Sequence, residues 1–411
     1  MKKRTLLLFV LLLNIGFAKL LKASDNDKPI KIDFYGFINY EMFFDSRQVV
    51  AAREGHVMLF PANEVLDEDG NDINAVPNFN FVSIASRFGA RISGPDAFGS
   101  KTSAVLEGDV LGIRAGLNSV ARLRLAYINL KWENSSLLAG QNWHPFFVGQ
   151  CFPSTVSFAG VVPYHMLNRS PQIKFAYDIS RFNLSAFLLS HNDFAALGPN
   201  GTSSEYIRNG MQPEAYLQVS IKGESFLFGV TGGYQSIMPR KETTAGYKTS
   251  ETMESLQANV FVRVNLPIIN IKLQSNYSEN PSNIIMIGGY GEATLLDEDR
   301  QIYSYTGIRS LNSWIDFETN GSSFKAGLLA GYSKNLGSTE DITGEVYARG
   351  ANIDYMFRIS PRVVYGSGKV QAGFEIVYDV AAFGTPDLRY NITDTKEVSN
   401  IRTVLALKYF F

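Results

Sequence analysis

Cysteine is nearly absent from this chain of 411 residues, which contains only Cys151. An internal disulfide is therefore excluded, and no cysteine–histidine spacing of the zinc-binding kind surrounds this residue. Charged residues are also sparse, at 19% of the chain, and the net charge is -1. No block of lysine and arginine could follow a phosphate backbone, so we expect no nucleic-acid partner.

Long hydrophobic runs are missing after the N-terminus. Met1-Lys2-Lys3-Arg4 precedes a short apolar run at 6–13. A basic start followed by such a run predicts a secretory signal peptide over 1–23, with cleavage after Ala18 or Ala23. No later stretch reaches the roughly 18 apolar residues that a membrane helix needs. If this exported chain spans a membrane, it must therefore do so as a closed barrel, which satisfies its backbone groups in lipid.

Aromatic residues and glycine are abundant. The chain has 29 Phe, 20 Tyr and 35 Gly, a composition that favours strands, tight turns and interfacial aromatic girdles. A closed barrel also explains how one domain can reach this length, because a barrel grows by adding strands. The composition therefore favours an all-β membrane protein.

Alternation of apolar and polar residues is clear in many segments. At 32–45, Phe34, Ile38 and Phe44 fall on one face, while Glu41 and Asp45 fall on the other. The same pattern recurs at 214–222, 255–265 and 269–277. A period of two predicts strands with one apolar and one wet face, as in a barrel with a water-filled lumen.

About sixteen such segments follow a short N-terminal stretch at 24–31, which we expect to lie in the periplasm. Long connections alternate with tight turns such as Gly94-Pro95-Asp96 and Gly223-Glu224, a rhythm typical of outer-membrane barrels. The sequence therefore predicts a transmembrane antiparallel β-barrel over 32–411. The predicted strands are 32–44, 80–93, 101–110, 121–132, 136–143, 171–179, 182–190, 213–222, 225–235, 252–265, 269–278, 308–317, 323–335, 347–359, 368–379 and 398–411.

The last strand has a distinctive end. Leu405, Leu407, Tyr409 and Phe411 share one face, and Phe411 is the last residue. This ending resembles the terminal strand of outer-membrane barrels, which the barrel-assembly machinery reads. The resemblance assigns Tyr409 and Phe411 to the assembly signal.

Four stretches resemble early strands of the Gram-negative trimeric porins, and in this order they are most similar to the dicarboxylate-type porins. They lie at 86–94, 104–109, 122–130 and 138–143. The resemblance implies a homotrimer in the bacterial outer membrane, in contact with lipid and lipopolysaccharide, that passes small solutes without a cofactor. Some members carry a coiled coil before the barrel, and 24–31 is too short for one.

Charged residues of the early strands are expected to face the lumen. The register places Arg87, Arg91, Arg122 and Arg124 inward, together with the carboxylates Glu107 and Asp109. The turn at 94–100 brings Arg87 near Glu107, and the next strand brings Arg124 near the same carboxylate. These groups either set up a field that orients permeating solutes or form ion pairs that stiffen the wall.

The connection at 144–170 is a candidate constriction loop. It is rich in phenylalanine and proline and contains no acid, while His144, His165 and Arg169 supply its polar character. Such an apolar loop fits against an inner wall, although an outer loop at a trimer contact is the alternative. General porins of this family usually have an acidic loop here, so the sequence departs from that pattern.

We therefore predict an outer-membrane porin for passive diffusion of small hydrophilic solutes, with a preference for anions or carboxylates. The alternatives are an outer-membrane barrel enzyme of the phospholipase or protease type and a barrel adhesin. No histidine lies in a recognisable nucleophile motif, so no catalytic role is expected. The acidic stretch 67–72 lacks the distal glutamate of a calcium loop and is expected to be a solvated loop.

Overall fold

The computed structural model describes residues 29–112, 116–117, 120–191 and 196–411. The predicted signal peptide at 1–23 lies outside these residues, as does all but the end of the predicted segment 24–31. No helix of the described residues is long and apolar enough to cross a membrane.

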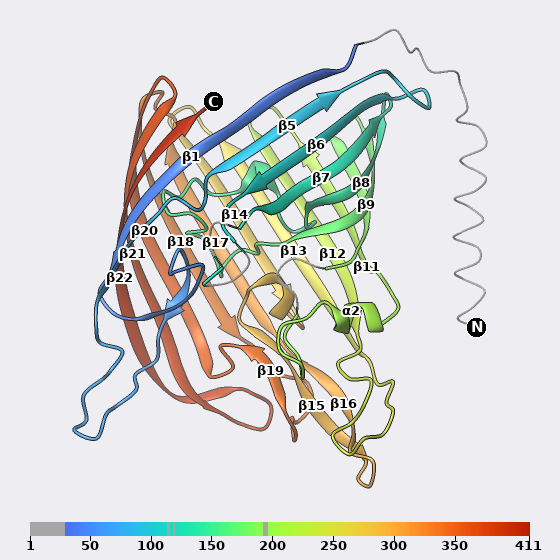
Figure 1. The fold of residues 1–411 in the computed structure, drawn as a ribbon, viewed down its shortest axis with the longest axis vertical. Helices are drawn as coiled ribbons and strands as arrows, with labels where there is room; N and C mark the ends of the chain where they lie inside the picture. The colour runs from blue at the N-terminus through green and yellow to red at the C-terminus, as the bar shows by residue number, and fades with distance from the viewer. Residues whose placement is uncertain (1–28, 113–115, 118–119, 192–195) are drawn as a thin grey trace.

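The chain forms a closed antiparallel β-barrel of sixteen strand positions (Figure 1). Consecutive wall strands pair around the ring, and the last strand pairs with the first to close it, with Tyr40 opposite Leu407. One position is shared by two short strands, β4 and β5, which follow each other along the same edge of β1. The wall strands are β1 (Lys31–Asp45), β4 (Asn78–Val82), β5 (Arg87–Ser93), β6 (Lys101–Asp109), β7 (Arg122–Lys131), β8 (Ser135–Trp143), β9 (Arg169–Ile179), β10 (Phe182–Leu189), β11 (Glu214–Lys222), β12 (Phe226–Ile237), β13 (Met253–Asn265), β14 (Ile269–Ser278), β17 (Ser310–Thr319), β18 (Phe324–Asn335), β20 (Ile353–Ser367), β21 (Val370–Pro386) and β22 (Ile392–Phe410).

The two faces of each strand follow the predicted alternation. On β1, Phe34 is 76% exposed on the outer face, whereas Glu41 and Asp45 on the inner face are 1% and 0% exposed. The exposed apolar face would meet lipid, and the polar face turns to the lumen. The lumen is therefore lined by polar side chains, and many of them are buried beneath loops that fold inward.

The connections separate by length between the two ends of the barrel. Both described ends of the chain lie at the end with short turns, such as 180–181 and 223–225, which we call the turn end (Figure 1). The opposite end, called here the loop end, carries the long connections and their own secondary structure. These elements are β2 (Val49–Ala52), β3 (Val57–Pro61), α2 (Glu205–Asn209), β15 (Gly288–Asp297), β16 (Ile302–Ile308), β19 (Val346–Arg349) and the 3-10 turns at Gly149–Cys151 and Ser282–Ile284.

Three predicted segments have wrong boundaries. The strand predicted at 80–93 is interrupted at 83–86, between β4 and β5. The strand predicted at 347–359 is split, because 346–349 pairs with β15 in a small sheet at the loop end while β20 runs on through Pro361 to Ser367. The predicted loop at 380–397 is largely strand, because β21 and β22 stay paired as far as Pro386 and Ile392. Pro361 has no N–H to donate, so the sequence at this point does not predict a strand. The ends of β21 and β22 are polar and resemble loops in the sequence.

Candidate functional site

A loop crosses the barrel interior between β8 and β9. This segment, residues 144–168 and called here the lumen loop, is the predicted constriction loop, which ends two residues earlier than expected. Near its start, the carbonyl of Pro145 accepts a hydrogen bond from Gln218 on β11. Further on, the N–H groups of Val156 and Ser157 donate to Glu375 on β21 at 2.6 and 2.7 Å. The loop therefore lies inside the barrel and is fixed to walls on both sides of the lumen.

The wall formed by β20 and β21, called here the far wall, holds the loop through a buried ion pair. Arg358 on β20 binds both carboxylate oxygens of Asp379 on β21, at 3.2 and 2.8 Å. The same guanidinium donates to the carbonyls of Gly160 and Val162 in the lumen loop. Paired and fully hydrogen-bonded charges of this kind fix geometry in a low-dielectric interior. This pair was not predicted from the sequence, although both residues lie within predicted strands, because its role depends on contacts with a loop distant in sequence.

The wall formed by β5, β6 and β7, called here the near wall, contains the charged early-strand residues that were predicted from the sequence. Arg122 and Arg124 both bind Asp109, and Arg124 also binds Glu107 at 2.7 Å. Arg87 lies 3.6 Å from the same Glu107 carboxylate. The predicted proximities are therefore present. A β-bulge in β7, where Arg124 is the extra residue opposite the Glu107–Gly108 step, turns this side chain toward both acids.

Arg91 differs from its neighbours. Its guanidinium stacks 3.8 Å from the centre of the Tyr35 ring, and no carboxylate of the described residues forms an ion pair with it. Arg169 is 1% exposed and lies 5.0 Å from the ring centre of Trp143. Of the predicted pore arginines, Arg91 is thus the exposed and uncompensated one.

The two histidines of the lumen loop are packed into the interior. His165 is fully buried, accepts a hydrogen bond from the indole of Trp314, and contacts Phe147 and Phe152 edge to face. His144 is 1% exposed and lies edge to face with Tyr216. His165 is therefore a packing residue in this arrangement, whereas the edge of His144 reaches a cavity.

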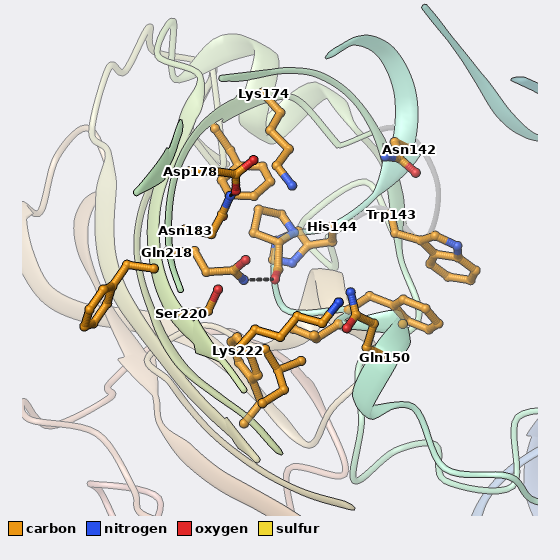
Figure 2. Close-up of a pocket in the computed structure, with 18 of the residues that line it drawn as sticks. Asn142, Trp143, His144, Gln150, Lys174, Asp178, Asn183, Gln218, Ser220 and Lys222 are labelled. Carbon is orange, nitrogen blue, oxygen red and sulfur yellow. Dashed lines mark hydrogen bonds between the residues drawn. The ribbon is translucent and has the colours of Figure 1, made fainter. Parts of the chain in front are cut away.

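That cavity lies on the turn-end side of the lumen loop and has a volume of about 570 Å³. Figure 2 shows Lys174 from β9 and Lys222 from β11 extending into it on either side of His144. Lys174 lies 5.0 Å from the Phe187 ring centre, and among the described residues neither lysine has a carboxylate within ion-pairing distance. Asp178, which also lines the cavity, pairs with Lys131 at 2.9 Å. The lining is therefore basic and largely uncompensated.

Three more lysines lie near the turn-end side of the lumen loop. Lys408 lines a second cavity of about 230 Å³ together with Lys325, which lies 3.5 Å from Glu318. Lys272 donates to the carbonyl of Phe152 and the hydroxyl of Ser154, so its charge holds the lumen loop. These lysines were not predicted from the sequence, because they sit singly on different strands.

The acidic stretch at 67–72 is a turn whose carboxylate serves the local backbone. Asp67 accepts hydrogen bonds from the N–H groups of Asp69 and Asn71, and also from the Asn71 side chain. The hydrogen bond from the Asn71 backbone is the main cause that lowers the pKa of Asp67, which is fully exposed to solvent. This arrangement is an Asx turn, in which the carboxylate organises the loop.

The chain end completes the closure of the barrel. Phe411 donates its N–H to the carbonyl of Gly36 at 3.1 Å and accepts from the N–H of Gly36 at 3.3 Å. Its side chain is 49% exposed on the outer face, as is that of Tyr409. Both residues of the predicted assembly signal therefore point outward at the turn end.

Two buried histidine–carboxylate pairs could suggest catalysis. His56 lies 2.9 Å from Glu41, and His191 lies 3.3 Å from Glu214. All four side chains are 1% exposed or less. Among the described residues, one group of three metal-type ligands comes together, at His144, His191 and Glu214.

Comparisons with solved structures find similar barrels. The chain matches the outer membrane channel DcaP of Acinetobacter baumannii with a TM-score of 0.68 and 14% identity, over 93% of this chain and 98% of that one. It matches OmpT of Vibrio cholerae with a TM-score of 0.53 and 12% identity over 95% and 99% of the two chains. It matches an anion-selective porin from Comamonas acidovorans with a TM-score of 0.53 and 10% identity, over 93% of this chain and 100% of that one.

No protein-family model and no curated protein matches this sequence. The structural likeness, at 14% identity or less, shows that the chain has the fold of the outer-membrane porins. The predicted barrel of about sixteen strands is confirmed.

Proposed function

We propose that this protein is a diffusion channel of the bacterial outer membrane that passes small hydrophilic solutes and prefers anions. The porin fold supports a channel, and the basic lining on the turn-end side of the lumen loop supports the preference. The observation that carries the proposal is the pair Lys174 and Lys222, whose charges extend into one cavity without carboxylate partners.

Three of the four early-strand arginines that the sequence singled out contribute little to the preference for anions. Arg122, Arg124 and Arg87 lie against Glu107 and Asp109. Two carboxylates thus offset most of the charge of three guanidinium groups, and the net field of this cluster along the pore is small. Uncompensated lysines act differently, because a cavity with low-dielectric walls concentrates their field and raises the local concentration of anions. Arg91 adds to this field at the turn end.

The lumen loop gives the channel a fixed narrow zone. Its contacts with Gln218, Glu375 and Arg358 hold it against opposite walls. A solute that enters from the loop end has to pass beside this loop before it meets the lysines. We infer that the loop selects by size and that the lysines select by charge.

The assembly state is part of the proposal. One of the similar structures, OmpT of Vibrio cholerae, is described as a trimer form. We propose a homotrimer for this chain, surrounded by outer-membrane lipid and lipopolysaccharide and inserted by the barrel-assembly machinery.

Reversal potentials in planar bilayers test the charge selectivity. The refolded wild-type protein in a gradient of potassium chloride should show a preference for chloride. Lys174→Gln with Lys222→Gln should shift the reversal potential toward cations, while Lys248→Gln should leave it unchanged because Lys248 is exposed in a loop-end connection. A cation-selective wild type, or equal effects of the cavity and loop substitutions, would contradict the proposal.

A further inference from the structure

Three potential metal ligands meet where β8, β10 and β11 reach the loop end. His144 follows β8, His191 follows β10 by two residues, and Glu214 is the first residue of β11. Leu189 pairs with Glu214, so the β10–β11 register brings the latter two ends together. The lumen loop starts beside them and supplies His144. All three ligand residues are 1% exposed or less.

Their ligand atoms converge. One nitrogen of each histidine and one oxygen of Glu214 all lie within 4.8 Å of one another. The closest measured pair, His191 Nε2 and Glu214 Oε2, is 3.3 Å apart. Ligands bound tetrahedrally to zinc at about 2.0–2.2 Å stand about 3.3 Å apart. The group therefore needs small adjustments to surround one ion.

One imidazole nitrogen of this group is unused. His144 Nε2 is buried, and no described residue gives it a hydrogen-bond partner. Buried polar atoms nearly always have a partner, so an orphaned imidazole nitrogen beside another histidine and a carboxylate indicates a missing ligand. His144 also lines the 570 Å³ cavity, so the site adjoins a space from which an ion could approach.

The surrounding residues can orient the ligands. Glu214 accepts hydrogen bonds from Gln235 at 2.7 Å and from Tyr216 at 2.8 Å. The amide of Asn283 lies 2.7 Å from His191 Nδ1. If this amide presents its oxygen, it accepts a hydrogen bond from Nδ1–H, and Nε2, which faces Glu214, is then the nitrogen that can bind a metal. Outer partners of this kind typically accompany histidine and carboxylate ligands.

We propose that His144, His191 and Glu214 bind one divalent transition-metal ion of the zinc class. Two imidazoles and one carboxylate match the ligand preference of zinc and leave a fourth position for water. Binding at His144 Nε2 requires a proton on Nδ1, which now accepts the N–H of Phe146 at 3.2 Å. That hydrogen bond is lost on binding, so the ion shifts the start of the lumen loop.

Cobalt titration of the full-length folded protein tests the site, because Co²⁺ bound to nitrogen and oxygen ligands absorbs visible light. After treatment with a chelator, the wild type should show one saturable absorption change per chain, and Zn²⁺ should reverse it. His144→Ala and His191→Ala should each weaken binding at least about tenfold. The readout is independent of transport, so failure of this site leaves the proposed channel function untouched.

Two further variants guard against misfolding. Glu214→Gln preserves side-chain size and should also weaken Co²⁺ binding. His56→Asn removes a buried histidine elsewhere and should bind Co²⁺ as the wild type does. Heat-modifiable migration checks that each variant is folded. Absence of a saturable signal in the wild type, or unchanged binding in folded His144→Ala and Glu214→Gln, would overturn the proposal.

Discussion

Tyr164 in the lumen loop donates a 2.9 Å hydrogen bond from its hydroxyl group to Asp379 on the opposite wall. Asp379 also accepts two hydrogen bonds from Arg358, one on each carboxylate oxygen. The same guanidinium donates to two carbonyl groups of the lumen loop. The loop and the far wall thus share one buried charged network. This network makes the position of the loop a property of the folded barrel.

Removing Arg358 should release the loop and destabilise the barrel. Arg358→Ala leaves Asp379 buried without its cation, which costs on the order of 3–5 kcal/mol. We expect a lower midpoint of unfolding in urea and larger, noisier single-channel conductance. Tyr164→Phe is the matched control, because it removes one hydrogen bond to a charged group, worth about 1.5–3 kcal/mol, and keeps the ion pair. A quieter or unchanged channel in Arg358→Ala would contradict the role of the network.

The near-wall arginines should affect selectivity only by exposing acids. In Arg122→Ala with Arg124→Ala, Glu107 and Asp109 lose the guanidinium groups that bind them. The reversal potential should then move toward cations, and carboxylate uptake should fall more than uptake of neutral sugars. Adding Glu107→Gln and Asp109→Asn should restore the wild-type reversal potential. If the fourfold variant stays cation-selective, these arginines attract anions directly.

The C-terminal residue should be needed for assembly. Phe411→Ser keeps the backbone hydrogen bonds to Gly36 but removes the outward ring, so it isolates the proposed recognition signal from strand pairing. We expect much less heat-modifiable protein in outer-membrane fractions, with refolding in detergent close to normal. Normal levels of the assembled variant in cells would remove support for the signal.

Closure of the barrel at the same place should depend on Gly36. A Cβ atom at this position would lie 2.3 Å from the carbonyl oxygen of Arg87 and 2.5 Å from the ring of Phe411. Gly36→Val should therefore impair refolding in detergent as well as assembly in cells. Gly232→Val is the control, since nothing lies within 4 Å of a Cβ atom there. Equal refolding of the two variants would show that β1 adapts at this contact.

The proposed homotrimer should be visible without heating. Protein extracted in mild detergent should migrate as a complex of three chains and dissociate on boiling. Single insertions into a bilayer should then show conductance in three equal steps. Migration at the mass of one chain together with single-step insertions would contradict the proposal.

The wall was largely predictable because its local pattern repeats. In β13, apolar residues face outward from Leu256 to Val264, and the inward residues from Ser255 to Asn265 are polar except Phe261. β20 was harder, since Pro361 interrupts the pattern of a strand that nevertheless remains paired with β18 and β21. Alternation with a period of two arises because one face of the strand is apolar. The pattern is therefore lost where both faces contact water or where a residue interrupts the hydrogen-bonded ladder.

The site was predictable only where its residues are close in sequence. Arg87, Glu107 and Arg124 lie on successive strands, so register alone brings them together. By contrast, Arg358 reaches carbonyl groups of the lumen loop almost 200 residues away. Such contacts depend on the curvature of the closed barrel, which no local pattern encodes.

The residues along the outward face of β22 indicate where the barrel crosses the boundary between lipid and water. Its outward residues are apolar or aromatic at Ile401, Leu405 and Leu407, whereas Glu397 and Ser399 are polar. From Ile401 to Phe411 the strand extends roughly 34 Å at about 3.4 Å per residue. At a tilt of about 40° this rises about 26 Å, close to the apolar band of about 25 Å. The boundary between lipid and water at the loop end therefore crosses β22 between Ser399 and Ile401, and the tip of the β21–β22 ribbon stands clear of the lipid.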